Sequence, residues 1–510
     1  MKKVILKSTI TGCLVILAIT AYSQATLEWN KTYGGNSFDE GHCIKQTADG
    51  GFIISGSTDS NNNGDVTGYK GGRDIWIVKT DNMGNLEWQG AYGGSGSEPW
   101  TEGYSHIIPL PDGGYFVMGE SQSSDGDLTE NKGNFDLWVF KIDNDGDIEW
   151  QKSIGGSLHD GATSVILNDD GSFMIAGYTS SSDGDVSDNK GMIDGWLVKL
   201  SADGNIIWEK TIGGTWTDGF RNIRHTEDGG YILTGSTLSN DGDLAGLNPG
   251  GWMELAKYWI VKLDENAEIE WQSVIGGTSK DEAQCIIPIN GGGYIVAGNA
   301  ESNNGDVTEN FGEKDWWVVR LDDIGTIVWE KTLGGSERDE VRSMEALSDG
   351  SAFFILGTTQ STDGHINSNT GEKEVWFVKM DFDGNILTSQ CFGGAGNQKG
   401  FYGVEAADGG IVITGNGQES SDLWVFKMAA TVGIDDFSEA QFSVYPNPTA
   451  DVLYFSEQFN SITVYSTNGQ KLLQSINKNH LNIKSLPTGS YILHAETMDG
   501  EITIKKVIKE

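Results

Sequence analysis

The chain has 510 residues, 71 glycines, four cysteines and an excess of acidic side chains that gives a formal net charge of −39. An acidic surface of this size repels nucleic acid and anionic lipid headgroups, so we expect no nucleic-acid partner. Beyond the N-terminal region the cysteines are Cys43, Cys285 and Cys391, an odd number that cannot pair fully, so we expect buried thiols rather than a disulfide framework or a metal cluster.

The N-terminus has the features of a secretion signal. Lysines at positions 2, 3 and 7 form a basic region, residues 14–20 form an apolar core, and Ala21-Tyr22-Ser23 is a small-residue cleavage site. We therefore predict a signal peptide over residues 1–23. No later segment approaches the roughly eighteen apolar residues that span a bilayer. The sequence predicts an exported protein without a transmembrane segment.

A cassette of about sixty residues recurs seven times between Leu27 and Lys427. Each copy contains a short apolar run that leads into a Gly-Gly pair, and in six copies this run ends in tryptophan. The six are Trp29, Trp88, Trp150, Trp208, Trp271 and Trp329, with Thr388 at the seventh position. A fixed period of this length indicates supersecondary units that stack on a shared core.

Each cassette predicts four strands. In the first copy these are 43–47, 52–56 after an Asp-Gly turn, 74–79, and the strand that carries Trp88. The third strand is apolar on both faces, as in a sheet packed between two neighbours. Its tryptophan recurs in all seven copies, at Trp76, Trp138, Trp196, Trp259, Trp317, Trp376 and Trp424. Four-stranded units in radial repetition form a β-propeller.

The two ends of the repeat region predict how the ring closes. The first cassette begins with a fourth-type strand at residues 27–33, and the last stops after a third-type strand at 422–427. An open ring would leave both strands as unpaired edges, which proteins avoid. We therefore predict an all-β fold in which residues 24–430 form a seven-bladed propeller whose N-terminal strand closes the last blade. A linear β-solenoid is the alternative, and the complementary ends argue against it.

After a linker at residues 431–441 the repeat is gone, and residues 442–510 carry other motifs. These are Val444-Tyr445-Pro446-Asn447-Pro448, the run 462–469, Leu486-Pro487-Thr488-Gly489-Ser490-Tyr491 and Lys505-Lys506-Val507. In this order they resemble the type IX secretion system C-terminal sorting domain. The characteristic positions are Pro446, Asn447, Pro448, Gly469, Gly489, Tyr491 and Lys505.

The resemblance implies a small β-sandwich that the outer-membrane translocon of a Gram-negative cell recognises. It also implies export across both membranes, removal of the domain, and attachment of the cargo to surface lipopolysaccharide or its release. An ordinary binding sandwich is the alternative.

The long loops of a propeller blade open on one face, where ligands usually bind. On this face an acid recurs four residues after most Gly-Gly pairs, and a second acid ends the long loop. The first set is Asp39, Asp160, Asp218, Asp281 and Asp339, with Glu102 near this position in the second cassette and Gln398 in the seventh. The second set is Asp65, Asp127, Asp185, Asp243 and Asp306, with His365 in the sixth cassette.

Two interpretations of these acids stay open. A ring of carboxylates could hold Ca²⁺, which takes six to eight oxygen ligands. An aspartate repeated in nearly every blade is more typical of a structural role, in which it accepts hydrogen bonds from loop amides.

The repeat is broken by insertions at residues 95–104 and 244–258. Tryptophans beside charged groups suit sugar binding, because an aromatic face packs on the C–H surface of a sugar while polar groups bond its hydroxyls. The ligand-binding candidates are Trp100, Trp216, Trp252, Arg221 and Arg338. The alternative is that these side chains fill gaps between blades.

The sequence favours an exported or surface-attached binding module for glycan or another extracellular polymer. The first alternative is a glycoside hydrolase or polysaccharide lyase, for which Glu98, Glu102 and Glu254 are the acid–base candidates. The second alternative is a scaffold that binds other proteins.

Overall fold

The computed structural model describes residues 26–98, 105–247, 255–366, 369–370, 372–394, 396–417, 422–430, 444–445, 447–449, 451–466, 471–496 and 502–509. The chain divides into two compact units, Met1–Ala430 and Thr431–Glu510. The predicted signal peptide at 1–23 and the predicted linker at 431–441 lie outside the described residues.

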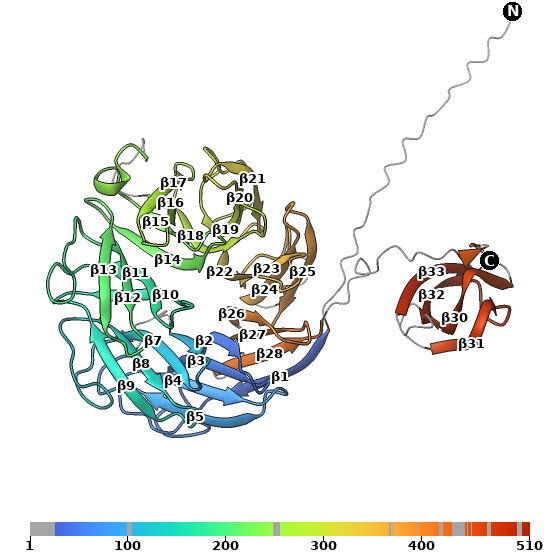
Figure 1. Cartoon of the computed structure of the whole chain (residues 1–510), viewed down its shortest axis with the longest axis horizontal. Coiled ribbons are helices and arrows are strands. Elements are labelled where there is room, and N and C mark those ends of the chain that lie inside the picture. Colours follow the sequence, from blue (N-terminus) through green and yellow to red (C-terminus); the bar gives the residue numbers. More distant parts are fainter. Residues whose placement is uncertain are drawn as a thin grey trace, which may run out of the picture. The chain divides into compact units, whose positions relative to one another are not determined.

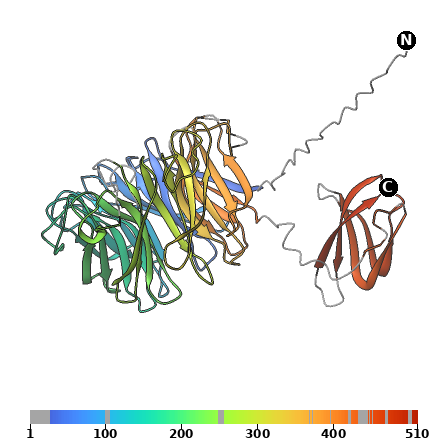
Figure 2. The ribbon, with the colours of Figure 1, turned by 90° about the horizontal axis from the view of Figure 1, so that it is seen from above.

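The described part of the first unit contains seven four-stranded antiparallel sheets, which confirms the predicted seven-bladed propeller. Figure 1 shows the sheets around a common axis with their first strands innermost, and Figure 2 shows the blades edge-on. The first strands are β2 (Asp39–Gln46), β6 (His106–Pro109), β10 (Asp160–Leu167), β14 (Asp218–His225), β18 (Asp281–Pro288), β22 (Asp339–Ala346) and β26 (Lys399–Glu405). The second strands are β3 (Phe52–Thr58), β7 (Tyr115–Ser121), β11 (Phe173–Thr179), β15 (Tyr231–Thr237), β19 (Tyr294–Ala300), β23 (Phe353–Thr359) and β27 (Ile411–Asn416).

The third and fourth strands complete each blade toward the outside of the ring. The third strands are β4 (Asp74–Thr80), β8 (Asp136–Ile142), β12 (Asp194–Leu200), β16 (Lys257–Leu263), β20 (Asp315–Leu321), β24 (Glu374–Met380) and β28 (Leu423–Met428). The fourth strands are β5 (Leu86–Tyr92), β9 (Ile148–Ile154), β13 (Ile206–Ile212), β17 (Ile269–Ile275), β21 (Ile327–Leu333), β25 (Ile386–Phe392) and, from the N-terminal end, β1 (Leu27–Tyr33). A short 3₁₀ helix, η1 (Gly242–Leu244), follows β15.

The ring closes through β1, as predicted. This strand pairs with β28, so that Tyr33 lies opposite Leu423 and Thr32 opposite Trp424. The seventh sheet therefore has the order β1-β28-β27-β26 and takes its strands from both ends of the repeat region. With this pairing no blade is left with three strands.

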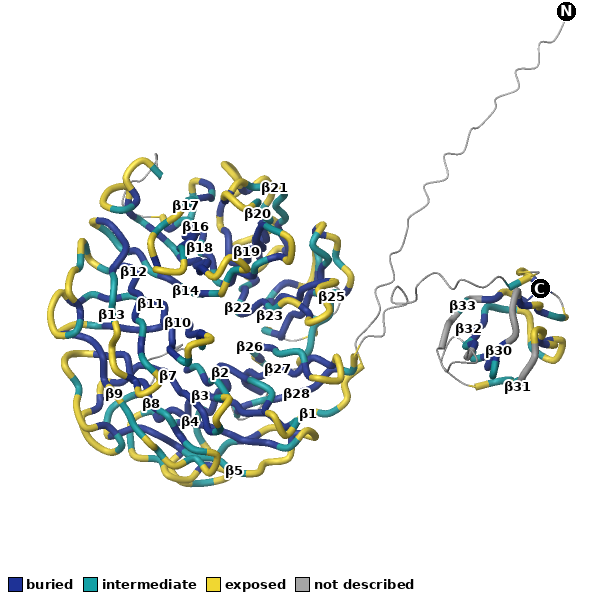
Figure 3. The backbone as a smooth tube through the Cα atoms, viewed as in Figure 1, coloured by how far each residue is buried: buried dark blue, intermediate teal, exposed yellow. Residues whose placement is uncertain are grey.

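The third-strand tryptophans form the core between blades. Trp76, Trp138, Trp196, Trp259, Trp317 and Trp376 are at most 1% exposed. Their indole N–H groups donate to a side chain thirteen residues later on the fourth strand, as from Trp76 to Gln89 at 2.7 Å and from Trp317 to Glu330 at 2.8 Å. A buried indole therefore keeps its donor satisfied while its ring fills the space between sheets. Buried segments follow the inner strands, and exposed ones the turns and outer edges (Figure 3).

The fourth-strand tryptophans have a different role, because they pack against the turn between the third and fourth strands of the next blade. A Cβ on the turn glycines Gly84, Gly204 and Gly325 would lie within 2.8 Å of the ring of Trp29, Trp150 and Trp271, respectively. These glycines also have positive φ, between 73° and 80°. The seventh blade has no such turn, because its fourth strand β1 comes from the other end of the chain. This explains why Thr388 replaces tryptophan in the sixth blade.

The second unit contains β29 (Val444–Tyr445), β30 (Val452–Ser466), β31 (Lys471–Asn482), β32 (Gly489–Glu496) and β33 (Ile502–Lys509). The long strand β30 changes register with β31 between Tyr454 and Phe459, so its two halves have different neighbours. A cluster that includes Leu453, Ile462 and Leu493 forms its core. The unit is sandwich-like, as predicted.

Candidate functional site

The repeated acids at the start of the first strands connect two loops of the structure: the Gly-Gly loop that leads into the blade, and the loop that follows the blade's second strand. Asp218 is fully buried, and its carboxylate accepts from the Gly214 amide at 2.8 Å, from Thr237 Oγ1 at 2.5 Å and from Ser239 Oγ at 2.6 Å. Asp39, Asp160, Asp281 and Asp339 accept from the matching glycine amide and from the hydroxyl of Ser60, Ser181, Ser302 and Ser361. These contacts fix the Gly-Gly loop against the end of the second strand.

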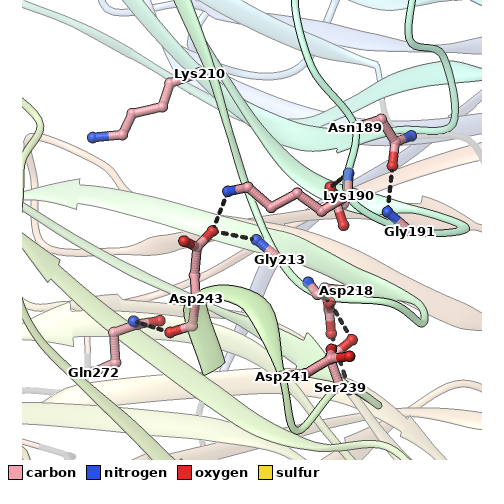
Figure 4. A network of polar contacts seen from close by, with 12 residues as sticks. Asn189, Lys190, Gly191, Lys210, Gly213, Asp218, Ser239, Asp241, Asp243 and Gln272 are labelled. Carbon is pink, nitrogen blue, oxygen red and sulfur yellow. Dashed lines mark hydrogen bonds and ion pairs between the residues drawn. The ribbon is translucent and has the colours of Figure 1, made fainter. Parts of the chain in front are cut away.

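The acids that end the long loops join neighbouring blades. Asp243 accepts from the Gly213 amide at 3.0 Å and from Lys190 of the preceding blade at 2.5 Å (Figure 4). Lys70 reaches Asp127 in the same way at 2.8 Å, and Lys132 reaches Asp185. Among the described residues no three His, Cys, Asp or Glu side chains come together as metal ligands. Ca²⁺ binding by either set stays a prediction.

In the second blade, Glu98 occupies the position of the repeated acid. It is fully buried, accepts from the Gly94 amide and from Ser121 Oγ, both at 2.9 Å, and burial raises its pKa. Glu102 was predicted to lie near this position, although Glu98 keeps the four-residue spacing from Gly94. Glu102, Glu254, Trp100 and Trp252 lie outside the described residues.

The loop face carries a hollow of about 470 Å³ over blades four to seven. Its lining contains seven cationic side chains and two carboxylates, a local surplus of five positive charges in a chain whose net charge is −39. We call it the basic hollow; its charged residues are Arg221, Lys280, Lys314, Arg338, Arg342, Lys373, Lys399, Glu282 and Glu340.

Strand direction explains why these cations meet. First strands begin, second strands end and third strands begin at the same end of each antiparallel sheet. Lys280 and Arg338 immediately precede β18 and β22, and Lys314 and Lys373 precede β20 and β24. A backbone bridge between Lys314 and Arg338 joins blades five and six at this level. The corresponding positions of the third blade hold His159 and Ile193, so the basic hollow is confined to one side of the ring.

Ion pairs hold part of the basic hollow in place. Arg338 contacts Glu340 at 2.6 Å and Arg342 contacts it at 3.4 Å. Although burial opposes ionisation of Glu340, these two arginines hold its pKa below its ordinary value. Lys314 is only 7% exposed, and its ammonium lies 3.7–3.9 Å from Glu282, Glu301 and Glu340, farther than a hydrogen bond.

The basic hollow continues into a small central pit of about 50 Å³ between the first strands. Arg221, Gln284 and Arg342 line both spaces; each lies three residues after the strand-initial acid of its blade. His42, Thr163 and Phe401, at the same position of their own first strands, also line the pit, together with Ser105 and Arg224. The Arg342 guanidinium lies 5.7 Å from the Phe401 ring centroid, and the His42 ring contacts the same ring edge-on at 5.6 Å.

Of the ligand-binding candidates, Arg221 and Arg338 lie in the basic hollow, and Trp216 is a half-buried loop residue outside its lining. Ligand binding by these residues stays a prediction. The lysines of the basic hollow are not among the candidates predicted from the sequence. A positional signal could have found Lys280, Lys314 and Lys373: lysine or arginine occupies the residue before the first and third strands in blades five and six together.

Cys43 and Cys285 are buried, as expected, whereas Cys391 is half-buried, and none of the three forms a disulfide within the described residues. Within the described residues, no helix is long and apolar enough to cross a membrane.

Comparison with known structures gives low similarity. BBS1N, in its complex with ARL6DN, is 11% identical with a TM-score of 0.43, over 81% of this chain and 99% of that one. The WD40 domain of Neurospora crassa Pan2 is 10% identical with a TM-score of 0.39, over 79% of this chain and 90% of that one. Puromycin hydrolase is 10% identical with a TM-score of 0.41, and the match covers 92% of this chain but 60% of that one. No curated protein sequence matches the chain.

A family model does match the second unit. Residues 443–510 match the secretion system C-terminal sorting domain, which confirms the resemblance to the type IX sorting domain. Asn447, Pro448, Gly489, Tyr491 and Lys505 are among the described residues of this segment, and Pro446 and Gly469 lie outside them. The chain therefore combines a seven-bladed propeller with a secretion sorting domain, which implies export and a cell-surface or secreted state.

Proposed function

We propose that the protein is an exported binding module whose basic hollow binds an acidic extracellular glycan, one that carries uronate or sulfate groups. The observation that supports it is the gathering of seven cations at one opening of a chain with net charge −39. The remaining acidic surface repels a polyanion, so the ligand is guided to the basic hollow. A guanidinium has five N–H donors that match carboxylate and sulfate oxygens, so Arg338 keeps donors for a ligand while its Nε and Nη2 donate to Glu340.

Calorimetry of the propeller against uronate-containing, sulfated and neutral polysaccharides tests this proposal. We expect saturable heat with the acidic polymers only, weaker at high salt because the contacts are ionic. Heat that continues after each injection would instead indicate turnover, and the lyase or hydrolase alternative would replace the binding module.

The double variant Lys373→Gln/Lys399→Gln identifies the site. The ion pairs of the basic hollow involve Lys280, Lys314, Arg338 and Arg342, so this change leaves them intact. We expect about a tenfold loss of affinity, because each rim lysine contributes on the order of 0.7 kcal/mol. The matched control is Lys152→Gln/Lys331→Gln, on the outer strands β9 and β21. Equal affinity of both double variants would contradict the assignment.

The sorting domain supports a location for this activity. We infer that it directs the propeller through the type IX translocon, across both membranes, to the cell surface or the medium. A variant that lacks residues 443–510 should accumulate inside the cell envelope, and immunoblotting of medium, surface and periplasmic fractions measures this.

A further inference from the structure

Neighbouring blades meet where the start of one blade's third strand contacts the Gly-Gly loop of the next blade; we call each such place a joint. At four of the seven joints of the described propeller, two fully buried acids face each other, one from each blade. These acid pairs are Asp74 with Glu98, Asp136 with Asp160, Asp194 with Asp218, and Asp315 with Asp339. At a fifth joint, which closes the ring, Asp39 faces the half-buried Asp422.

The two carboxyl groups of an acid pair approach the same side of one glycine. A Cβ on Gly155 would lie 2.5 Å from Asp136 Oδ1 and 2.8 Å from Asp160 Oδ2. Gly334 lies in the same way between Asp315 and Asp339. Two negative charges this close in a buried place repel each other strongly, because little water screens them.

One oxygen of each pair also lacks a hydrogen-bond donor. Asp136 Oδ2 accepts from the Lys132 amide at 2.5 Å, whereas its Oδ1 is buried and accepts no hydrogen bond from the described residues. The same holds for the two oxygens of Asp74, Asp194 and Asp315. A buried carboxylate oxygen without a donor is costly, but a protonated oxygen is itself a donor that the facing carboxylate can accept.

The charged groups around the acid pairs are engaged elsewhere. The lysines beside the first three pairs are each bound to an acid of the next blade: Lys70 to Asp127, Lys132 to Asp185, and Lys190 to Asp243. Beside the fourth pair, Lys314 and Arg338 face Glu340, and Asp363 adds a further negative charge. These groups therefore leave the second negative charge of each pair uncompensated.

The two remaining joints indicate how much charge a joint tolerates. At the joint after the fourth blade, Lys257 stands in place of the third-strand acid, and its charge opposes the rise that burial causes in the pKa of Asp281. At the joint after the sixth blade, Gln398 stands opposite Glu374, and its Oε1 accepts from the Gly394 amide at 3.2 Å as the acids do. Glutamine has the shape of a protonated glutamate. Neither joint holds two negative charges.

We propose that each acid pair shares one proton, which the third-strand aspartate donates through Oδ1 to the facing carboxylate, and that these protons fasten neighbouring blades to each other. Burial, and then the facing acid, raise the pKa of Asp315 to about 7 and that of Asp194 to about 6. An unfolded aspartate loses its proton near pH 4, so the folded protein holds these protons where the unfolded chain does not. The joints therefore weaken as the pH rises through this window. This device goes beyond the proposed binding function and does not depend on it.

Proton release on unfolding tests the inference. The full-length protein is unfolded in guanidinium at about pH 5.5, and the base that holds the pH constant is measured; each shared proton consumes about one equivalent. Asp315→Asn should consume about one equivalent less than wild type. Asp203→Asn, in an exposed turn, is the matched control and should equal wild type. Equal consumption by wild type and Asp315→Asn would show that the native pair is fully ionised and would overturn the inference.

The reverse substitution tests the same point without removing a carboxyl group. Gln398→Glu creates a new acid pair with Glu374 and should consume about one equivalent more than wild type. Its melting temperature should equal that of wild type at pH 5, which checks folding, and fall below it at pH 8. Unchanged base consumption would show that a joint accepts two negative charges, against the inference.

Calcium distinguishes a shared proton from a bound cation. The melting temperatures of wild type and Asp315→Asn are measured at pH 8 with EDTA and with added Ca²⁺. A shared proton predicts the same effect of Ca²⁺ on both proteins. A Ca²⁺-dependent rise in wild type that Asp315→Asn abolishes would show that a cation neutralises the pair, and the inference would be wrong.

Discussion

At the scale of single residues, the repeated acids of the loop face are buried and hydrogen-bonded within the fold rather than exposed to solvent. Asp74 begins β4, and one of its carboxylate oxygens accepts from the Lys70 amide at 2.7 Å. The other oxygen, Oδ1, lies near Glu98, because both carboxylates approach the same side of Gly93. A Cβ on Gly93 would lie 2.5 Å from Asp74 Oδ1 and 2.6 Å from Glu98 Oε2. Burial, and then the charge of Glu98, raise the pKa of Asp74 to about 7, and similar surroundings raise that of Asp315 to about 7.

These raised pKa values predict a pH-dependent stability. In the unfolded chain an aspartate loses its proton near pH 4, whereas folded Asp74 keeps it until about pH 7. The folded state therefore binds more protons between these values, and stability falls by about 1.4 kcal/mol per pH unit as the pH rises through this window. Asp74→Asn should reduce this slope and be more stable than wild type at pH 8. Guanidinium unfolding at pH 5 and pH 8 measures it.

Asp145→Asn, in an exposed turn, is the control and should leave the slope unchanged. Identical slopes for wild type and Asp74→Asn would show that the native Asp74 carboxyl is already ionised at pH 5.

At the scale of elements, the strands were predictable because turn residues and alternation repeat seven times. The first strand was predicted to begin at Cys43, whereas β2 begins at Asp39. A register shift between Gly41 and Cys43 interrupts the alternation, so only the part beyond it was visible as a pattern. The basic hollow was less accessible to prediction. The lysines and arginines before the strands of blades five and six form a pattern in the sequence, whereas Arg221 and Lys399 are single deviations in blades four and seven. Only the fold shows that these cations converge.

The turn between third and fourth strands gives a paired prediction. Gly325 has φ +80°, and a Cβ there would lie 2.6 Å from the Trp271 ring. Gly325→Ala should therefore lower stability by about 1–3 kcal/mol. The preceding blade already has Ala267 at this position with φ 61°, so Ala267→Gly should raise stability, by up to about 1 kcal/mol. Thermal and denaturant unfolding of both variants test this, and a stabilising Gly325→Ala would contradict the strain argument.

At the scale of the whole molecule, the propeller is a closed ring whose charge is unevenly distributed. The acidic surface and the basic hollow belong to one chain, and a sorting domain accompanies them. The closure by β1 was predictable from complementary strand types at the two ends of the repeat region. The hydrogen bonds that link Lys45, Arg224, Glu345 and Tyr402 were not predictable, because these residues are far apart in sequence and occupy no common motif.

Removal of residues 24–33 tests the closure. The edge of β28 would lose its partner, and Trp424 would lose the neighbouring Thr32. We expect a lower melting temperature and concentration-dependent association through the open edge, measured by light scattering after size-exclusion chromatography. A synthetic peptide of residues 26–34, added in trans, should reverse both effects. A monomeric variant with the wild-type melting temperature would show that the ring is stable without β1.

The threonine at position 388 also indicates in which blade the two ends of the repeat region meet. A fourth-strand tryptophan is useful only where the following blade has a continuous hairpin to receive it, so the exception falls one blade before the break in the chain. If β28 and β1 were joined by a hairpin and the ring were opened elsewhere, the exception would belong to a different cassette. In repeats of this kind, the copy that lacks its fourth-strand tryptophan thus predicts, from sequence alone, which blade combines strands from both ends of the chain.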